Sequence, residues 1–127
     1  MLSGHPVFAY VPAIDVERAR EFYEQKVGLA PGVRTGPGYT FKFAEGTAFF
    51  LYPTPNAGGN RASCAFWMVP DVRAVVKDLK SRGIVFEEYD MPDMMPDNSI
   101  YTGGGASTAW FMDTEGNTMA IVQSLEG

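Results

Sequence analysis

Residues 8–29 read FAYVPAIDVERAREFYEQKVGL, and residues 64–84 repeat their pattern as CAFWMVPDVRAVVKDLKSRGI. Each copy begins with apolar residues that suit a strand. An aspartate, Asp15 or Asp71, then stands directly before apolar residues at helical spacing, which is the place of a helix N-cap. A glycine near the end of each copy marks the end of the helix. The sequence therefore predicts two similar units that each open with a strand and a helix.

The repeat continues beyond each helix as two strands joined by a tight turn. These strands lie within TFKFAEGTAFFLYP (40–53) in the first copy and within AWFMDTEGNTMAIV (109–122) in the second. The second turn, 113–117, has typical turn residues, with Gly116 available for a positive φ. The second copy is longer because residues 89–105, rich in Pro, Gly and Asp, form an inserted loop.

These patterns predict one α+β domain over residues 1–127. We expect two βαβββ modules in tandem, at about 5–55 and 62–125. Neither module could bury both faces of its sheet alone, so the two should pair. The expected result is a curved, cleft-lining eight-stranded sheet with the two main helices outside.

Composition narrows the possible functions. The chain has 127 residues, of which 46% are hydrophobic and 20% are charged, and its net charge is −5. No cluster of Lys and Arg is present, which argues against nucleic acid as a partner. No apolar run is long enough for a membrane helix, so we expect no membrane association. The single cysteine fits a reducing compartment and favours a cytoplasmic location.

The motifs together resemble the vicinal oxygen chelate superfamily, which includes glyoxalases, bleomycin-resistance proteins and extradiol dioxygenases. The resemblance rests on VPAIDVERAREFYEQKVGL, FWMVPDVRAVVKDLKSRGI and WFMDTEGNTMAIVQ, and with the repeat it covers nearly the whole chain. It implies the fold more strongly than any one function, because this fold hosts many activities. It also implies a homodimer, since related small domains commonly pair to complete or cover their clefts.

The resemblance also implies where a metal would bind. Metal-using members place their ligands, typically His or Gln, Glu, His and Glu, on strands that line the cleft. The equivalent positions here are Phe8, Phe50, Cys64 and Ala120. Only the cysteine has a ligating atom, whereas divalent ions need several oxygen or nitrogen ligands. We therefore expect no metal, no cofactor and no metal-dependent catalysis of the family type.

The same strands predict an aromatic cleft. Side chains on a strand alternate between its faces, so the neighbours two residues away share the cleft face. The predicted ligand-binding residues are Phe8, Tyr10, Phe50, Tyr52, Cys64, Phe66, Met68 and Ala120. Aromatic side chains suit a flat ligand. The alternative is that these residues simply fill a core. Cys64 alone is more typical of a small buried side chain than of a reactive thiol.

Three functional hypotheses follow. The first is a metal-free small-molecule-binding protein, similar to the bleomycin-resistance branch, with an aromatic cleft for a flat and possibly cationic ligand. The second is a metal-dependent lyase, isomerase or dioxygenase of the same superfamily. The third is a metal-free enzyme that uses Tyr10, Tyr52 or Cys64 as an acid–base group. No catalytic residues are predicted. The loop 90–99, with methionines at 91, 94 and 95, either contacts the ligand or is a solvated surface loop.

Overall fold

The chain folds as two modules with the same order of strands and helix. This computed structural model describes residues 1–89 and 95–125. The first module contains β1 (Ala9–Ala13), α1 (Val16–Glu21), β2 (Val33–Thr35), β3 (Gly38–Lys42) and β4 (Ala48–Pro53). The second contains β5 (Ser63–Met68), α2 (Val72–Ser81), β6 (Tyr101–Gly103), β7 (Ala106–Met112) and β8 (Thr118–Ser124). Short helical segments are η1 (Leu2–Gly4), η2 (Phe22–Val27) and η3 (Ala44–Gly46). The predicted α+β fold with two βαβββ modules is confirmed.

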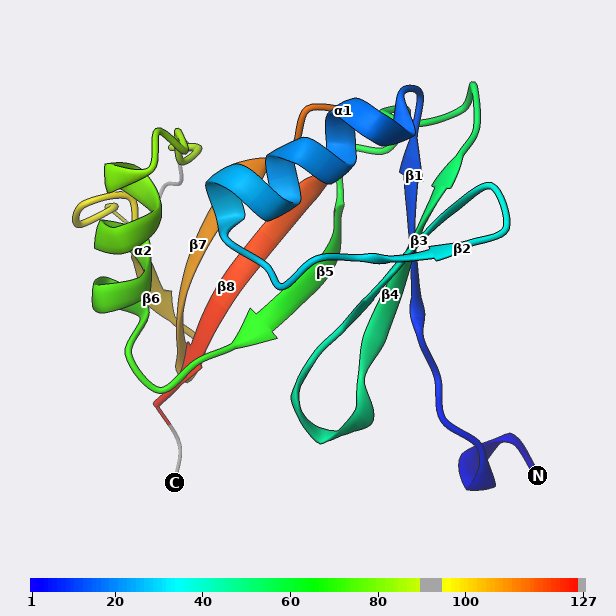
Figure 1. Cartoon of the computed structure of the whole chain (residues 1–127). Helices are drawn as coiled ribbons and strands as arrows, with labels where there is room; N and C mark the ends of the chain where they lie inside the picture. Colours follow the sequence, from blue (N-terminus) through cyan, green and yellow to red (C-terminus); the bar gives the residue numbers. More distant parts are fainter. Residues whose placement is uncertain (90–94, 126–127) are drawn as a thin grey trace.

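The strands are divided between two four-stranded sheets, one for each module. Their orders are β1-β4-β3-β2 and β5-β8-β7-β6. In each sheet the first strand pairs in parallel with the last strand of its module, and the remaining pairs are antiparallel. The two sheets meet at β1 and β5. Figure 1 shows α2 lying against β7 and β8 of the second sheet, while α1 crosses the region between the two sheets.

Both helices begin at the aspartates that the sequence indicated. The carboxylate of Asp15 accepts a hydrogen bond from the N–H of Arg18, and that of Asp71 accepts one from Ala74. Each carboxylate thereby satisfies one of the unpaired N–H groups of a first helical turn. After α1 the chain continues as the π-helical segment η2, and Gly28 ends this segment with a φ of 82°. None of the described helices has the length and apolar character needed to cross a membrane.

A single hydrophobic core lies on the helix side of the two sheets. Tyr23, at the start of η2, is fully buried, and its ring packs 5.3 Å from that of Phe49 in the first sheet. The adjacent Phe22 packs 6.3 Å from Phe111 in the second sheet. The segment from α1 to η2 therefore contacts both modules and joins them in one core. The opposite face of the strands carries Tyr10, Phe50 and Phe66, three of the residues that the sequence assigned to a cleft.

Candidate ligand-binding site

Three aromatic side chains pack together on the face of the first sheet that the helices do not cover. Tyr10 of β1 lies beside Phe50 of β4 in the sheet register, and Tyr52 follows two residues later. The ring centroids of Tyr10 and Tyr52 are 5.1 Å apart, and those of Tyr10 and Phe50 are 6.0 Å apart. Tyr10 is 69% exposed, whereas Phe50 and Tyr52 are partly buried. This aromatic cluster (Tyr10, Phe50 and Tyr52) therefore offers ring surface to a molecule arriving from solvent.

A hollow of about 270 Å³ adjoins this cluster where the two modules meet. Tyr10 and Tyr52 line one part of it, and the loop from Asn56 to Ala62 lines another. Cys64 at the start of β5 and Asn117 in the turn before β8 complete the walls. This junction hollow thus receives side chains from both modules. Its volume is close to the lower end of the range of about 300–1,000 Å³ for small-molecule pockets.

Two glycines allow the loop 54–62 to pack closely on the turn 113–117. A Cβ on Gly58, whose φ is +80°, would lie 2.7 Å from the backbone oxygen of Glu115. A Cβ on Gly116 would lie 3.0 Å from Cα of Gly58. The two backbones therefore approach more closely than side-chain-bearing residues permit. The loop is held against the turn as a wall of the junction hollow.

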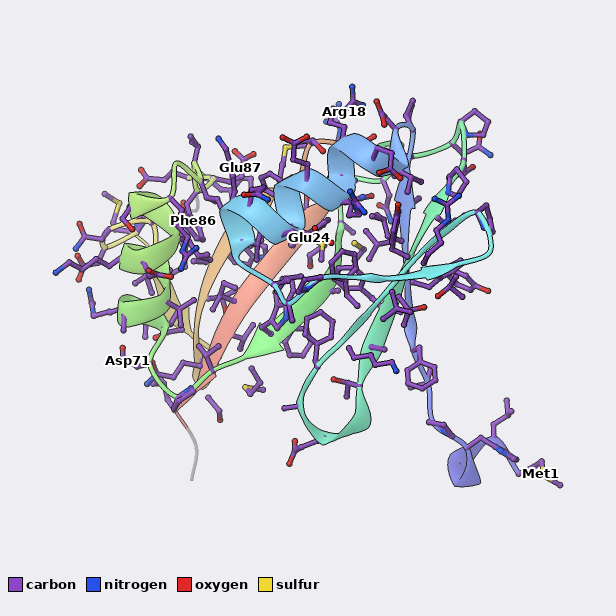
Figure 2. The ribbon with its side chains drawn as sticks, in the orientation of Figure 1. Met1, Arg18, Glu24, Asp71, Phe86 and Glu87 are labelled. Carbon is purple, nitrogen blue, oxygen red and sulfur yellow. The ribbon has the colours of Figure 1, made fainter. Side chains whose placement is uncertain are left out.

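The turn is also tied to the N-terminal end of α1. Oε1 of Glu115 accepts hydrogen bonds from the N–H of Asp15 at 2.9 Å and from Nη2 of Arg18 at 3.0 Å. Nε of Arg18 donates to Oε2 of Glu115 at 2.8 Å, and Figure 2 labels Arg18 at the start of α1. Burial alone would raise the pKa of Glu115, but these hydrogen bonds and one from Thr114 lower that pKa to about 2. Glu115 is therefore a charged, fully paired group that joins the modules.

A second group of buried hydrogen bonds fixes the wall of the junction hollow. The hydroxyl of Tyr23 donates to Oδ2 of Asp113 at 2.6 Å. Oδ1 of Asp113 accepts from the N–H groups of Glu115 and Asn117. Nδ2 of Asn117 donates to the Pro12 oxygen at 2.7 Å and to Oδ2 of Asp113 at 2.8 Å. Burial, followed by the charge of Asp113, raises the pKa of Tyr23 well above its usual value. Tyr23 therefore serves as a neutral donor in the core.

Cys64 does not follow the alternation that the sequence suggested for β5. The pairing of β5 with β8 shifts register between Ser63 and Ala65, so Cys64 occupies a bulge. Its Sγ lies 3.4 Å from Sδ of Met119, a fully buried core residue. Burial, with a smaller effect from the charge of Asp113, raises the pKa of the Cys64 thiol. The thiol stays protonated at neutral pH and is a poor nucleophile.

Four of the other predicted residues do not line the junction hollow: Phe8, Phe66, Met68 and Ala120. Phe66 and Met68 are 60% and 62% exposed on β5, and Phe66 pairs in register with Ala120 of β8. Ala120 is buried, with 3% exposure. Phe8 lies just before β1 and is 53% exposed. Of the eight predicted residues, the structure brings Tyr10, Tyr52 and Cys64 together in the hollow and places Phe50 beside it.

Solved structures share this arrangement of elements, although no family model matches the chain and no curated protein matches its sequence. TnmS3, an antibiotic binding protein from Streptomyces sp. CB03234, is 24% identical with a TM-score of 0.66, over 94% of this chain and 95% of that one. A glyoxalase/bleomycin resistance protein/dioxygenase from Alicyclobacillus acidocaldarius is 19% identical with a TM-score of 0.70, over 96% and 92%. The chain has the vicinal oxygen chelate fold.

The positions that the resemblance assigns to metal ligands carry few donor atoms. Phe8, Phe50 and Ala120 have no ligating side-chain atom, and the thiol of Cys64 contacts Met119. Across residues 1–89 and 95–125, no three His, Cys, Asp or Glu side chains gather as a metal site would require. The donor set of these positions does not fit a divalent ion.

The amide side chains of the junction hollow were not predicted from the sequence. Asn56 and Asn60 lie in the loop between the modules, whose Pro, Gly and Asn residues are typical of a linker. Asn117 belongs to the Asp113–Asn117 turn, which was assigned only a turn function. The one sequence signal for this wall is the tight turn with its glycine. The approach of the loop to this turn is not visible in the sequence, because the two segments meet only in the folded chain.

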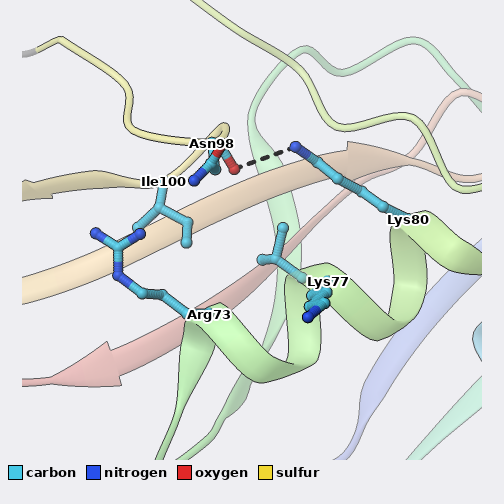
Figure 3. A pocket seen from close by; sticks show the side chains of 6 residues that line it. Arg73, Lys77, Lys80, Asn98 and Ile100 are labelled. Carbon is cyan, nitrogen blue, oxygen red and sulfur yellow. Dashed lines mark hydrogen bonds between the residues drawn. The ribbon is translucent and has the colours of Figure 1, made fainter.

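A larger hollow of about 360 Å³ lies on α2, away from the aromatic cluster. Figure 3 shows Arg73 and Lys80 extending from the helix toward Ile100 and Asn98, with Lys77 between them on α2. Arg73 forms an ion pair with Asp97 at 2.7 Å, and Nζ of Lys80 donates a hydrogen bond to the main-chain oxygen of Asn98 at 3.2 Å. Two of the three cations thus hold the turn 97–100 against the helix. We favour the junction hollow as the ligand site because both modules and the aromatic cluster build it.

Proposed function

We propose that this protein binds a planar, largely apolar small molecule in the junction hollow, without a metal ion and without turnover. The observation that carries this proposal is the partly exposed aromatic cluster beside the amide-lined walls. Mutually packed rings left open to solvent suit recognition of a flat ligand, since aromatic contacts add about 0.5–1.5 kcal/mol beyond area burial. One structure of the same fold, TnmS3, is described as an antibiotic binding protein, which supports a binding role.

The chemistry of the site supports binding rather than catalysis. The four metal-ligand positions offer a single thiol, and the pKa of that thiol is raised. A protonated thiol does not act as a base at neutral pH. Rings and a net charge of −5 make a cationic ligand more favourable than an anionic one. The cytoplasmic location that the single cysteine favours stays a prediction.

A homodimer is part of this proposal. Phe66 and Met68 lie on the strand face that the helices do not cover, and both are largely exposed in the single chain. A second copy placed over this face would remove their apolar surface from water and deepen the site. The dimer is also what the family resemblance predicts.

A screen of planar aromatic compounds by thermal shift, followed by calorimetric titration of the hits, tests the proposal. Tyr10→Ala and Phe50→Ala are expected to weaken binding about tenfold, because each removes a ring contact and its apolar area. Val85→Ala, at an exposed apolar residue of the second module, is the control and should leave affinity unchanged. Hits that bind Tyr10→Ala and Phe50→Ala as tightly as the wild type would place the ligand elsewhere and contradict the proposal.

A further inference from the structure

The side-chain amide of Asn117 is held in one orientation. Its Nδ2 donates to two acceptors, the Pro12 oxygen and Oδ2 of Asp113. Both partners can only accept hydrogen bonds when the aspartate is charged, so the nitrogen must face them. The main-chain N–H and oxygen of Asn117 are also paired, both with Asp113. Oδ1 is therefore directed away from these partners.

Oδ1 of Asn117 is an unused acceptor that solvent can reach. Asn117 is only 6% exposed, yet its Oδ1 has no hydrogen-bond partner among the described residues. The one side-chain polar atom in those residues that is both sealed from solvent and unpartnered is Nε of Arg20. The oxygen of Asn117 thus keeps its access to solvent, and the hollow that Asn117 lines is the junction hollow. Oδ1 of Asn117 is therefore a hydrogen-bond acceptor of fixed orientation at the proposed ligand site.

We propose that the ligand of the junction hollow carries a hydrogen-bond donor, a phenolic hydroxyl or a ring N–H, that binds Oδ1 of Asn117. This inference rests on the proposed function and specifies its ligand. A ligand that covers this oxygen without a donor leaves a buried acceptor unpaired, which costs affinity. A ligand oxygen without hydrogen, such as an ether or quinone oxygen, would face the lone pairs of Oδ1 and be disfavoured.

The donor is expected to be neutral. The nearest carboxylate in this wall, Asp113, already accepts hydrogen bonds on both oxygens from Tyr23, Glu115 and Asn117. Glu115 is likewise fully paired, with Arg18 and Asp15. The remaining acceptor is an uncharged amide oxygen, which a hydroxylated aromatic ring or a heteroaromatic N–H satisfies without desolvating a full charge. The wall therefore favours a donor-bearing planar ring over a permanently charged cation.

The geometry of the walls places the donor at the edge of the ring system. Pro12, which holds the Asn117 amide, is two residues after Tyr10 on β1, and both line the junction hollow. A flat ligand whose face contacts the rings of Tyr10 and Tyr52 would present its edge to the wall formed by the turn 113–117. Asn117 would then decide which substituted rings bind, while the aromatic cluster would supply most of the contact area.

Titration of the intact wild-type protein with 2-naphthol and with 2-methoxynaphthalene tests this inference. The two probes share a ring system, but only the first has a donor. We expect 2-naphthol to bind about tenfold more tightly, because the ether leaves Oδ1 unpaired. In NMR spectra 2-naphthol should shift the side-chain amide resonances of Asn117, and the ether should shift them less.

Two variants test whether other residues of the junction hollow produce the preference. Asn56→Ala removes a different amide of the hollow and should preserve the preference for 2-naphthol. Tyr10→Ala should weaken both probes by the same factor. Equal affinities for the two probes, or a preference that disappears in Asn56→Ala, would overturn the role of Asn117. If neither probe binds although the thermal-shift screen yields other planar ligands, this inference fails and the proposed function stands; if the screen yields none, both fail.

Discussion

The hydroxyl of Tyr23 donates a 2.6 Å hydrogen bond to Oδ2 of Asp113, which links η2 of the first module to the turn before β8 of the second. Both residues are buried, so the loss of the donor leaves part of a carboxylate unpaired in the core. Tyr23→Phe should lower the free energy of unfolding by about 2 kcal/mol, the typical contribution of a hydrogen bond to a charged group. Urea denaturation measures the change. Tyr52→Phe, at a half-buried tyrosine, should stay within about 0.5 kcal/mol of the wild type.

The stability of the protein should depend on the ionisation of Glu115. Its pKa is about 2 in the folded chain, below the ordinary value of 4.5. A lowered pKa means that the charged form stabilises the fold, and this contribution is complete above the unfolded pKa. It should be lost as the pH falls from about 4.5 to about 2. Urea denaturation at several pH values should show a smaller decline over this window for Glu115→Gln. An equal decline in both proteins would contradict this role.

The close approach of the loop and the turn predicts an unusual sensitivity at Gly58. A methyl group there would meet the Glu115 oxygen at 2.7 Å, and the φ of +80° is unfavourable for alanine. Gly36 also has a positive φ, of +54°, but a methyl group would meet nothing within 4 Å. Gly36→Ala should therefore cost about 1 kcal/mol of unfolding free energy, from the backbone alone. Gly58→Ala should cost more and should also weaken ligand binding, because the wall must move. Equal costs in the two variants would argue against the packed wall.

Cys64 should react slowly with thiol reagents. Its pKa is raised by burial and by the charge of Asp113, so little thiolate exists at pH 7. The rate of reaction with Ellman's reagent is expected to fall below that of a free cysteine at pH 7 and to keep rising above pH 9, where the free thiol levels off. Cys64→Ser should still bind the ligand. A fast reaction at neutral pH would instead revive a catalytic role for this thiol.

The exposed apolar residues of β5 predict the assembly state. Light scattering at micromolar concentration should give a mass near twice the 13.9 kDa of one chain. Phe66→Asp would place a charge in the proposed interface and should shift the protein toward the monomer. The Tyr89→Ser variant changes an exposed aromatic residue outside that strand and is the control. A wild-type mass near 13.9 kDa would show that the face is not an interface between copies.

Local patterns in the sequence predicted the fold well because they reflect local physics. The N-caps at Asp15 and Asp71 and the alternation in β4 need only neighbouring residues, and the structure confirms them. In β8 the first four residues are all buried, so its two faces are not distinguished by burial. The internal repeat also predicted that the two modules have the same order of elements, which no single motif could indicate. The division of the strands into two four-stranded sheets was not evident, because sheet edges depend on how the modules pack.

The site was predicted less completely. The bulge at Cys64 depends on pairing with β8, and the role of Asn117 depends on a contact with Pro12, which is distant in the sequence. Sequence patterns report which face a side chain occupies, but not which atoms lack a partner. The predictions for Met91 and Met94 concern residues outside the described part of the chain. Met95 is described and is 87% exposed.

The two modules are alike in sequence pattern, but their turns differ in the structure. Glu115 in the second module is buried and paired with Arg18, whereas Glu45, its equivalent in the repeat, is exposed in η3 with a φ of 60°. The end of the molecule that contains Glu115 therefore has its buried hydrogen bonds already formed without a ligand. A ligand that binds there does not have to order this part of the chain. Binding therefore costs little chain entropy, and more of the contact energy contributes to affinity.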